Sequence, residues 1–366
     1  MEVEYQCSKS GLRAKLIREL GRERDCAEQE LLDAGLPLAL SHRAVWAAHR
    51  YRRESWFLLV RDQHGRACAG VAIERARTRA LPGHVILRVG KFGGSLPQEV
   101  SRVALQTIAQ LAKRNPRVLR LHVNVFSRDR RKAIADTLEQ LGFREIQPPS
   151  SYRHTLVIDL KPSEDAIFAS FSSNARRKIR ESIKTSLRSI VITDPVYAER
   201  LHELQHEALL RTGGRSPSQD WRGILRMSHE NPNISRVVGL FPGEDTSPEK
   251  MGAFLWACNH GDHGEYRAAG STRRGDLRIP YGYLLTWDVI RWAKATGAEW
   301  FDMGGVTLPE GDEPELDGIS RFKRYFSRQI AEVGAEWVFE PFPLRARFAT
   351  LVSRGASHVR EWIRRG

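Results

Sequence analysis

The segment from Tyr266 to Phe326 constrains the fold of this chain more than any other part of the sequence. Its apolar residues Leu285, Val289 and Trp292 recur at helical spacing, which places them on one face of a helix that Gly297 can end. A strand is expected before this helix, and a strand and a short basic helix after it: Tyr266–Gly270, Glu299–Met303 and Ile319–Phe326. This order of elements is typical of an α/β arrangement around one sheet.

The first half of the chain predicts the same succession of elements, about 180 residues earlier. Three strands, a helix and a fourth strand are expected at Trp56–Arg61, Ala67–Glu74, Val85–Val89, Val100–Leu111 and Leu119–Phe126. Gly90–Gly94 is expected to form a loop, and residues 1–30 a charged helical segment. Pro148–Ser151 is the natural linker between the halves. The repetition indicates a duplicated α/β domain, and 366 residues suit two domains better than one.

The charge of the chain favours a polyanionic partner. A formal net charge of +14, from 58 Lys+Arg against 44 Asp+Glu, suits nucleic acid, a phosphorylated substrate or an anionic membrane face, the alternative being an arginine-rich enzyme.

The four cysteines, Cys7, Cys26, Cys68 and Cys258, form no CxxC pair, which argues against a zinc site and a disulfide framework. The sequence shows no secretory signal and no run near the roughly 20 apolar residues of a membrane span, so a cytoplasmic protein is expected.

A basic segment lies between the halves. Ser173 or Asn174 is expected to cap a helix whose first turns carry four cations: Arg176, Arg177, Lys178 and Arg180. Cations at a helix start oppose the helix dipole, which suggests a use. These residues are candidates to bind acceptor phosphates or the backbone of a tRNA, and the alternative is a solvated basic face.

A second basic segment is the tail that begins at Pro341. Apolar residues recur in it at near-helical spacing beside several arginines: Leu344, Phe348, Leu351, Val352, Val359 and Trp362. Such a segment could dock on the protein, lie on an anionic membrane or contact RNA, and docking is favoured.

The C-terminal half, from about residue 155 to 340, resembles the FemAB/FemX family of aminoacyl-tRNA-dependent peptidyltransferases. The resemblance is strongest in three segments: Pro280–Trp287, Phe301–Gly305 and Gly318–Lys323. The basic helix after Asn174 and the segment Thr212–Arg215 also look like family positions. The first half matches only in the order of its elements.

The resemblance implies an α/β (α+β) fold of two tandem GNAT-like domains, each a mixed central sheet flanked by helices. Residues 1–153 would form the first domain, with 336–366 packing back on it as a C-terminal helix, and residues 154–335 the catalytic domain. Family members transfer an amino acid from tRNA to an amine of a peptide or peptidoglycan-precursor acceptor, with no cofactor besides the aminoacyl-tRNA co-substrate. The long helical hairpin of the best-known cell-wall members is absent and the Trp46 region matches only loosely, so the acceptor stays open.

The resemblance also assigns site residues. Phe322 and Lys323 occupy the family's Phe-Lys position, where the lysine assists the reaction at the aminoacyl ester. From the residues themselves, a fixed cation such as Lys323 can stabilise a developing oxyanion, an effect worth roughly 3–4 kcal/mol for a comparable donor. Asp302 either orients or deprotonates an amine or satisfies turn amides. Tyr281 is a candidate acceptor contact, and Arg215 either binds phosphate or carboxylate or forms a loop salt bridge.

Two other functions compete with this one. An acyl-CoA-dependent GNAT-type N-acyltransferase would need a Q/R-x-x-G-x-G/A loop between strand and helix, and neither Ser271–Gly282 nor Gly90–Gly94 has that spacing. A non-catalytic RNA-binding protein would use the basic surface alone, but the sequence has no RNP-like strand and no suitable KH-type loop.

Overall fold

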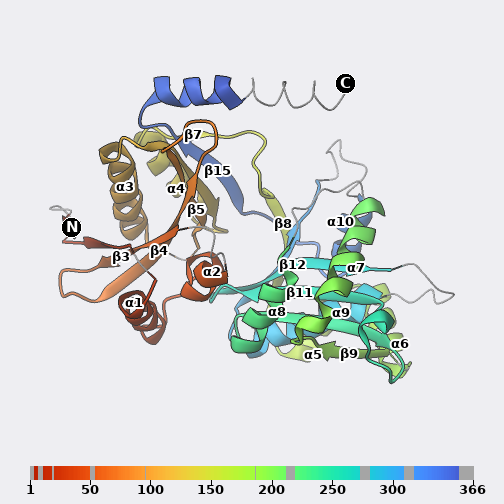
Figure 1. Cartoon of the computed structure of the whole chain (residues 1–366). Coiled ribbons are helices and arrows are strands. Elements are labelled where there is room, and N and C mark those ends of the chain that lie inside the picture. The colour runs from red at the N-terminus through yellow and green to blue at the C-terminus, as the bar shows by residue number, and fades with distance from the viewer. Residues whose placement is uncertain are drawn as a thin grey trace, which may run out of the picture. The chain divides into compact units, whose positions relative to one another are not determined.

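The computed structural model describes residues 4–6, 11–18, 20–49, 54–94, 96–185, 187–211, 219–272, 281–308 and 317–353. The chain divides into two compact units (Figure 1). The first comprises Met1–Ser151 with Val333–Gly366, and the second comprises Tyr152–Glu332.

The first unit is built on an eight-stranded sheet in the order β1-β2-β3-β4-β5-β6-β15-β7. Its strands are β1 Glu4–Gln6, β2 Arg13–Ile17, β3 Glu54–Arg61, β4 Ala67–Arg77, β5 Val85–Gly93, β6 Val118–Phe126, β7 Arg144–Glu145 and β15 Gly334–Phe339. Its helices are α1 Arg22–Asp33, η1 Leu40–His42, α2 Ala44–His49, α3 Gln98–Arg114 and α4 Arg131–Gln140, and residues 343–353 are also helical.

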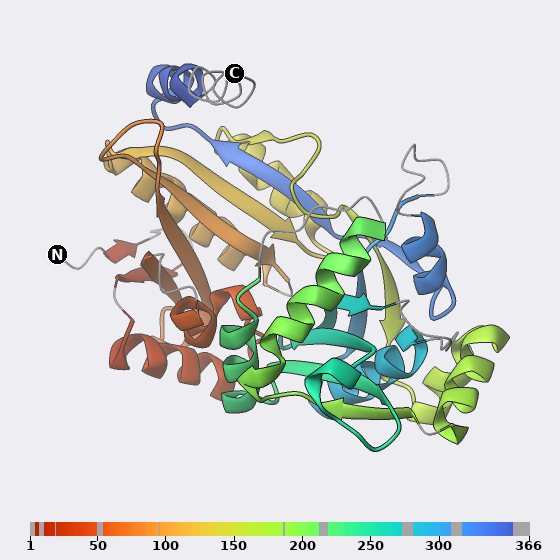
Figure 2. The ribbon, with the colours of Figure 1, turned by 45° about the vertical axis from the view of Figure 1, so that its right-hand side comes forward.

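Both faces of this sheet are covered because its strands alternate apolar residues to either side. Leu58 and Val60 of β3 join a core under α3 and α4, whereas Phe57 and Leu59 join a second core under α1. The helices on the two faces are visible in Figures 1 and 2. A sheet buried on both faces is what the apolar runs in β3 and β4 require.

The second unit is built on a seven-stranded sheet in the order β14-β8-β13-β12-β11-β10-β9. Its strands are β8 His154–Asp159, β9 Leu187–Val191, β10 Ser235–Pro242, β11 Ala253–Asn259, β12 His263–Ser271, β13 Trp300–Gly305 and β14 Ile330–Glu332. Its helices are α5 Glu164–Ser170, α6 Ser173–Lys184, η2 Pro195–Tyr197, α7 Ala198–Arg211, α8 Trp221–Glu230, η3 Pro248–Lys250, α9 Tyr281–Ala295 and α10 Asp317–Arg324.

The periodicity of α9 sets the core of this unit. Leu285, Val289 and Trp292 are all buried, and they pack with apolar residues of α5, α6 and the central strands. Gly297 follows the helix with φ +87°, a conformation that favours glycine and ends the helix as predicted. On the opposite face, Trp221 of α8 packs edge-on against Phe254 of β11.

The predicted repetition is confirmed. In each unit three antiparallel strands, β3-β4-β5 or β10-β11-β12, lead through one helix, α3 or α9, into a strand parallel to the third, β6 or β13. An antiparallel strand then lies outside the parallel one, β15 in the first unit and β8 in the second. Each unit is therefore a mixed sheet flanked by helices.

Three local predictions were wrong. Residues 13–17 form a strand rather than a helix, because alternating Ala14 and Leu16 bury against the sheet. Gly90–Gly93 belongs to β5 and forms a bulge against β6, not a loop. The cap of α6 is Ser172, whose side chain accepts a hydrogen bond from the backbone N–H of Ala175, rather than Ser173 or Asn174. In the described part of the chain, no helix combines the length and apolar character needed to span a membrane.

Candidate active site

The two units differ at their parallel strand pair. In the first unit β5 and β6 stay paired, across a bulge, as far as Gly93 and Phe126. In the second unit β12 and β13 pair only as far as Glu265 and Asp302, although both strands continue beyond them. We call this place, where the strands separate beyond Glu265 and Asp302, the β12–β13 fork. Strands that separate leave backbone groups available to other partners.

Lys323 of α10 reaches into the β12–β13 fork. Its side chain is buried, its Nζ donates a hydrogen bond to the carbonyl oxygen of Gly305 at 2.7 Å, and Nζ lies 5.5 Å from the ring centroid of Tyr266. Burial lowers the pKa of Lys323 to about 8, against the opposing attraction of the Asp302 and Glu265 carboxylates. The side chain is thus a desolvated cation at neutral pH, with its titration brought near the physiological range.

Asp302 holds a tight turn at the end of β13. Its Oδ1 accepts hydrogen bonds from the backbone N–H of Gly304, at 2.7 Å, and from the hydroxyl of Thr155. Gly304 has φ +72°, and a Cβ there would lie 3.0 Å from the carbonyl oxygen of Tyr266. The turn therefore requires glycine. Of the two roles expected for Asp302, these contacts match a carboxylate that satisfies turn amides.

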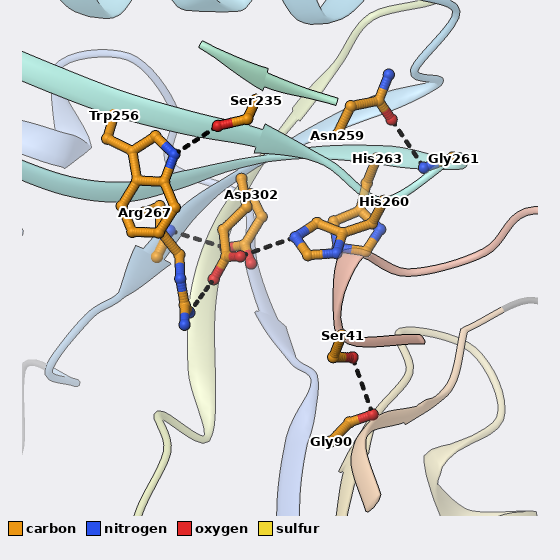
Figure 3. A network of polar contacts seen from close by, with 12 residues as sticks. Ser41, Gly90, Ser235, Trp256, Asn259, His260, Gly261, His263, Arg267 and Asp302 are labelled. Carbon is orange, nitrogen blue, oxygen red and sulfur yellow. Dashed lines mark hydrogen bonds and ion pairs between the residues drawn. The ribbon is translucent and has the colours of Figure 1, made fainter. Parts of the chain in front are cut away.

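A buried polar network adjoins this turn (Figure 3). The hydroxyl of Tyr152 contacts two carboxylates, Asp302 Oδ2 at 2.5 Å and Glu265 Oε1 at 3.1 Å. Glu265 is also bound by Arg267, at 3.4 Å, and by Nε2 of His260, at 2.8 Å. Burial raises the pKa of Tyr152 well above its usual value, and Glu265 raises the pKa of Arg267. The phenol therefore stays protonated and acts as a donor to the carboxylates.

A stack of rings extends the network beyond His260. The rings of His260 and His263 lie 4.6 Å apart and nearly parallel, and His263 stacks in turn on Trp300 at 4.4 Å. Nδ1 of His263 lies 2.6 Å from Oδ1 of Asp262. These contacts hold His260 in the orientation from which it binds Glu265, as Figure 3 shows for the two histidines.

Phe322, the predicted neighbour of Lys323 in the site, packs α10 against α9. Its ring meets Tyr283 edge-on at 5.1 Å and Phe326 at 5.4 Å. A Cβ on Gly282 would lie 2.9 Å from the Phe322 ring, so this contact depends on a glycine at the start of α9. Phe322 thereby fixes the helix that carries Lys323.

The basic helix α6 lies beside α9. Nδ2 of Asn174 donates a hydrogen bond to the hydroxyl of Tyr283 at 3.2 Å, and Tyr283 in turn contacts Phe322. The cations of α6 thus belong to the same group of packed helices as Lys323. Arg177 and Lys178 pair with Glu181 on their own helix. Exposed pairs of this kind are weak, so both cations remain available to a stronger anion.

Of the other predicted binding residues, the structure describes the side chains of Arg180 and Arg176 but not those of Arg215 and Tyr281. Arg180 is exposed and lies over the ring of Phe168, and Arg176 is half-buried. Arg215 lies outside the described residues. The backbone of Tyr281 begins α9, but its side chain lies outside what the structure describes.

The sequence did not single out Tyr152, Thr155, Glu265 or His260. Glu265 lies just before the expected strand Tyr266–Gly270, and β12 also carries His263 and Arg267, so no local pattern marked this carboxylate. The others come from distant segments, and the pairing of β8 with β13 and of β13 with β12 brings them together. Among the described residues, no group of three His, Cys, Asp or Glu side chains is placed to hold a metal ion.

The arrangement can stabilise negative charge. Lys323 places a buried ammonium at the fork, and the hydrogen-bonded turn and network fix the groups around it. A preorganised donor in a dry site stabilises an oxyanion far better than one in water. The same ammonium carries a proton that a departing oxygen can take up.

Comparison with solved structures shows the fold. The chain superposes on the crystal structure of FemX with a TM-score of 0.72 and 12% identity, over 88% of this chain and 98% of that one. L-PGS from Bacillus licheniformis gives 0.52 and 12%, over 92% and 98%. The C-terminal domain of an Agrobacterium fabrum protein described as a lysylphosphatidylglycerol synthetase gives 0.51 and 12%, over 90% and 96%. No family model and no curated protein matches the sequence.

These similarities confirm two predictions. The chain resembles FemX, and its fold class is α/β with two tandem GNAT-like domains. At 12% identity the likeness concerns the fold. The chemistry must therefore be argued from the site.

Proposed function

We propose that the protein is an aminoacyltransferase that moves an amino acid from aminoacyl-tRNA to an amine of a peptide or peptidoglycan-precursor acceptor. The single observation that carries the proposal is the buried ammonium of Lys323 at the β12–β13 fork, bonded to the Gly305 carbonyl oxygen at 2.7 Å. The FemX-like fold supports it, because Lys323 occupies the Phe-Lys position of the resemblance. The named product of the lysylphosphatidylglycerol synthetase also carries an amino acid.

In the proposed reaction a neutral acceptor amine attacks the carbonyl carbon of the aminoacyl ester. A C–N bond forms and the carbonyl oxygen becomes an oxyanion, which the Lys323 ammonium stabilises. The C–O bond to the ribose then breaks, the departing oxygen takes the proton of Lys323, and the lysine regains a proton from the nitrogen that attacked. Among the described residues, Nζ has one hydrogen-bond acceptor, Gly305, which leaves donors for this work.

The other residues of the site position this lysine. Asp302 and Thr155 fix the turn that presents the Gly305 carbonyl oxygen, and Phe322 fixes α10 against α9. The carboxylates of Asp302 and Glu265 oppose the effect of burial and keep the pKa of Lys323 from falling further. Asp302 is fully buried and has turn and hydroxyl partners, so in this proposal it is a positioning residue rather than the base.

Phosphates of the tRNA or of the acceptor would be bound by the cations of α6. Arg176, Arg177, Lys178 and Arg180 lie on the helix that packs against α9, which also carries the Phe322 contact. Guanidinium groups bind phosphate oxygens in a bidentate manner. The proposal expects Arg215 and Tyr281 to add contacts to the same substrates, and it needs no cofactor.

The test compares donors. The protein is incubated with a labelled mixture of aminoacyl-tRNAs, or with labelled acyl-CoAs, together with extracts that contain candidate peptides. Label that moves from tRNA to a peptide, and is lost when RNase is added first, supports the proposal. Transfer from acyl-CoA that survives RNase would instead establish the N-acyltransferase. The Lys323→Met variant distinguishes transfer by this site from transfer by a contaminating enzyme.

A further inference from the structure

The helix formed by residues 343–353 is drawn in blue in Figure 2. Its two faces differ in what they contact. Its inner face packs on the first unit through Ala346 and Ala349, which are buried. Arg120 of β6 donates hydrogen bonds to the carbonyl oxygen of Ala346 at 3.1 Å and to the Thr350 hydroxyl at 2.6 Å. The helix is thus held in a fixed rotation about its own axis.

The outer face of the same helix is apolar and exposed. Leu344, Phe348, Leu351 and Val352 have exposed fractions of 80%, 57%, 66% and 40%. They supply four of the twelve exposed large hydrophobic side chains found in the described part of the chain, and only one of the other eight, Leu20, lies in the same unit. Such a concentration marks an interaction surface rather than the scattered apolar residues of ordinary surfaces.

Arginines border this face on both sides. At about 100° of rotation per residue, the four apolar side chains span an arc of about 100°, with Arg347 beyond one edge and Arg345 beyond the other. Both arginines are exposed, and Arg345 also bonds the carbonyl oxygen of Pro116. Residues 341–353 contain no Asp or Glu.

We propose that this outer face, Leu344, Phe348, Leu351 and Val352 with Arg345 and Arg347, binds the surface of an anionic lipid bilayer. An apolar arc enters the boundary between headgroups and acyl chains, and arginines at its edges bind headgroup phosphates while their stems stay in the apolar layer. The inference does not depend on the reaction at the β12–β13 fork.

Two other occupants fit the face less well. A second copy of the chain, docked face to face, would bring four arginines together with no carboxylate on either helix to neutralise them. RNA would use the arginines but gives no reason to expose four large apolar side chains. A bilayer with anionic lipid satisfies both features at once.

The test is flotation of the full-length protein with vesicles of phosphatidylcholine alone or of equal parts phosphatidylcholine and phosphatidylglycerol. We expect wild-type protein to float with the anionic vesicles. The variants Phe348→Ser/Leu351→Ser and Arg347→Glu should each bind these vesicles with an affinity at least about tenfold lower. The control is Val196→Ser/Leu210→Ser, which alters two side chains with exposed fractions of 60% and 71% in the other unit and should bind like wild type.

Unchanged circular dichroism and melting temperature would show that the variants are folded, as expected for exposed positions. Equal flotation of Phe348→Ser/Leu351→Ser and wild type would overturn the proposal. A second outcome would also overturn it: light scattering shows that the wild type is a dimer and that this variant is a monomer. The face would then bind a second copy of the chain. Loss of tRNA binding in the same variant, without any wild-type flotation, would assign the face to RNA and equally overturn it.

Discussion

Nζ of Lys323 lies 2.7 Å from the carbonyl oxygen of Gly305, a backbone group beyond the point where β12 and β13 stop pairing. The fork that admits this ammonium is specific to the second unit, because in the first unit the parallel strands remain paired across their bulge. Two copies of one architecture have therefore diverged at the place where a buried cation can be held. That divergence gives a physical reason to assign chemistry to the second unit.

The pH dependence of turnover follows from the pKa of Lys323. Because burial lowers this pKa to about 8, the ammonium is lost above about pH 8, and the rate divided by the neutral fraction of the acceptor amine should fall there with a slope of one in log units. The measurement is the initial rate from pH 6 to 10, corrected for spontaneous hydrolysis of the ester. In Lys323→Met the residual rate should lack this descending limb, and a limb that persists unchanged would assign the titration to another group.

The lowered pKa of Lys323 should also make the free energy of unfolding depend on pH. The unfolded chain keeps the Lys323 proton up to about pH 10.5, whereas the folded protein releases it near pH 8, so between these values the unfolded state binds more protons. The free energy of unfolding of wild type, relative to Lys323→Met, should therefore rise over this range, by about 3 kcal/mol in all. Denaturant titrations of both proteins at pH 7, 8, 9 and 10 measure it. A flat or falling difference would show that the ammonium is not buried.

Tyr152→Phe tests the polar network. It removes the hydroxyl that contacts Asp302 at 2.5 Å and Glu265 at 3.1 Å, leaving two buried carboxylates one donor short. The expected loss in free energy of unfolding is about 1–3 kcal/mol. Tyr325→Phe is the matched control, because the Tyr325 hydroxyl has no hydrogen bond within the described chain, and it should cost much less. Equal losses in free energy of unfolding for the two variants would show that the hydrogen bonds of Tyr152 do not stabilise the site.

The basic helix α6 should give tRNA binding a steep salt dependence. Each phosphate contact by Arg176, Arg177, Lys178 or Arg180 contributes about 0.7–0.9 to the slope of log affinity against log salt. Replacing all four with Gln should make the slope shallower by the corresponding amount. Arg66→Gln/Arg144→Gln alters two residues with 77% and 67% exposed side chains in the other unit and should change it little. A flat salt response in wild type would exclude phosphate binding as the purpose of this charge.

Local pattern was enough to predict the elements of the site but not its network. The spacing of Leu285, Val289 and Trp292 predicted α9, because helical spacing is a property of residues close together in the sequence. Tyr152 and Glu265 could not be linked in this way. Their contact depends on the register that pairs Asp302 with both Val157 and Glu265, which is set by the order of strands in the sheet rather than by either segment alone.

Two of the wrong local predictions have the same kind of cause. The charges around Ala14 and Leu16 suggested a helix, but β2 pairs with β3 and buries alternate residues, so sheet pairing overrode the local charge pattern. The glycines after Val89 suggested a loop, yet β6 supplies a partner strand that keeps Phe92 and Gly93 in the sheet beyond a bulge. The glycines correctly indicated an irregular backbone, but they could not distinguish a bulge within a strand from a loop.

The central claim is that the buried ammonium of Lys323 assists amide formation from aminoacyl-tRNA. Its most direct test is the single-turnover rate with saturating protein, measured for wild type, Lys323→Met and Arg321→Met, the last altering an exposed cation on the same helix. We predict a fall of about 100- to 1,000-fold for Lys323→Met, with its fold intact, and a wild-type rate for Arg321→Met. A wild-type rate in Lys323→Met would contradict the account.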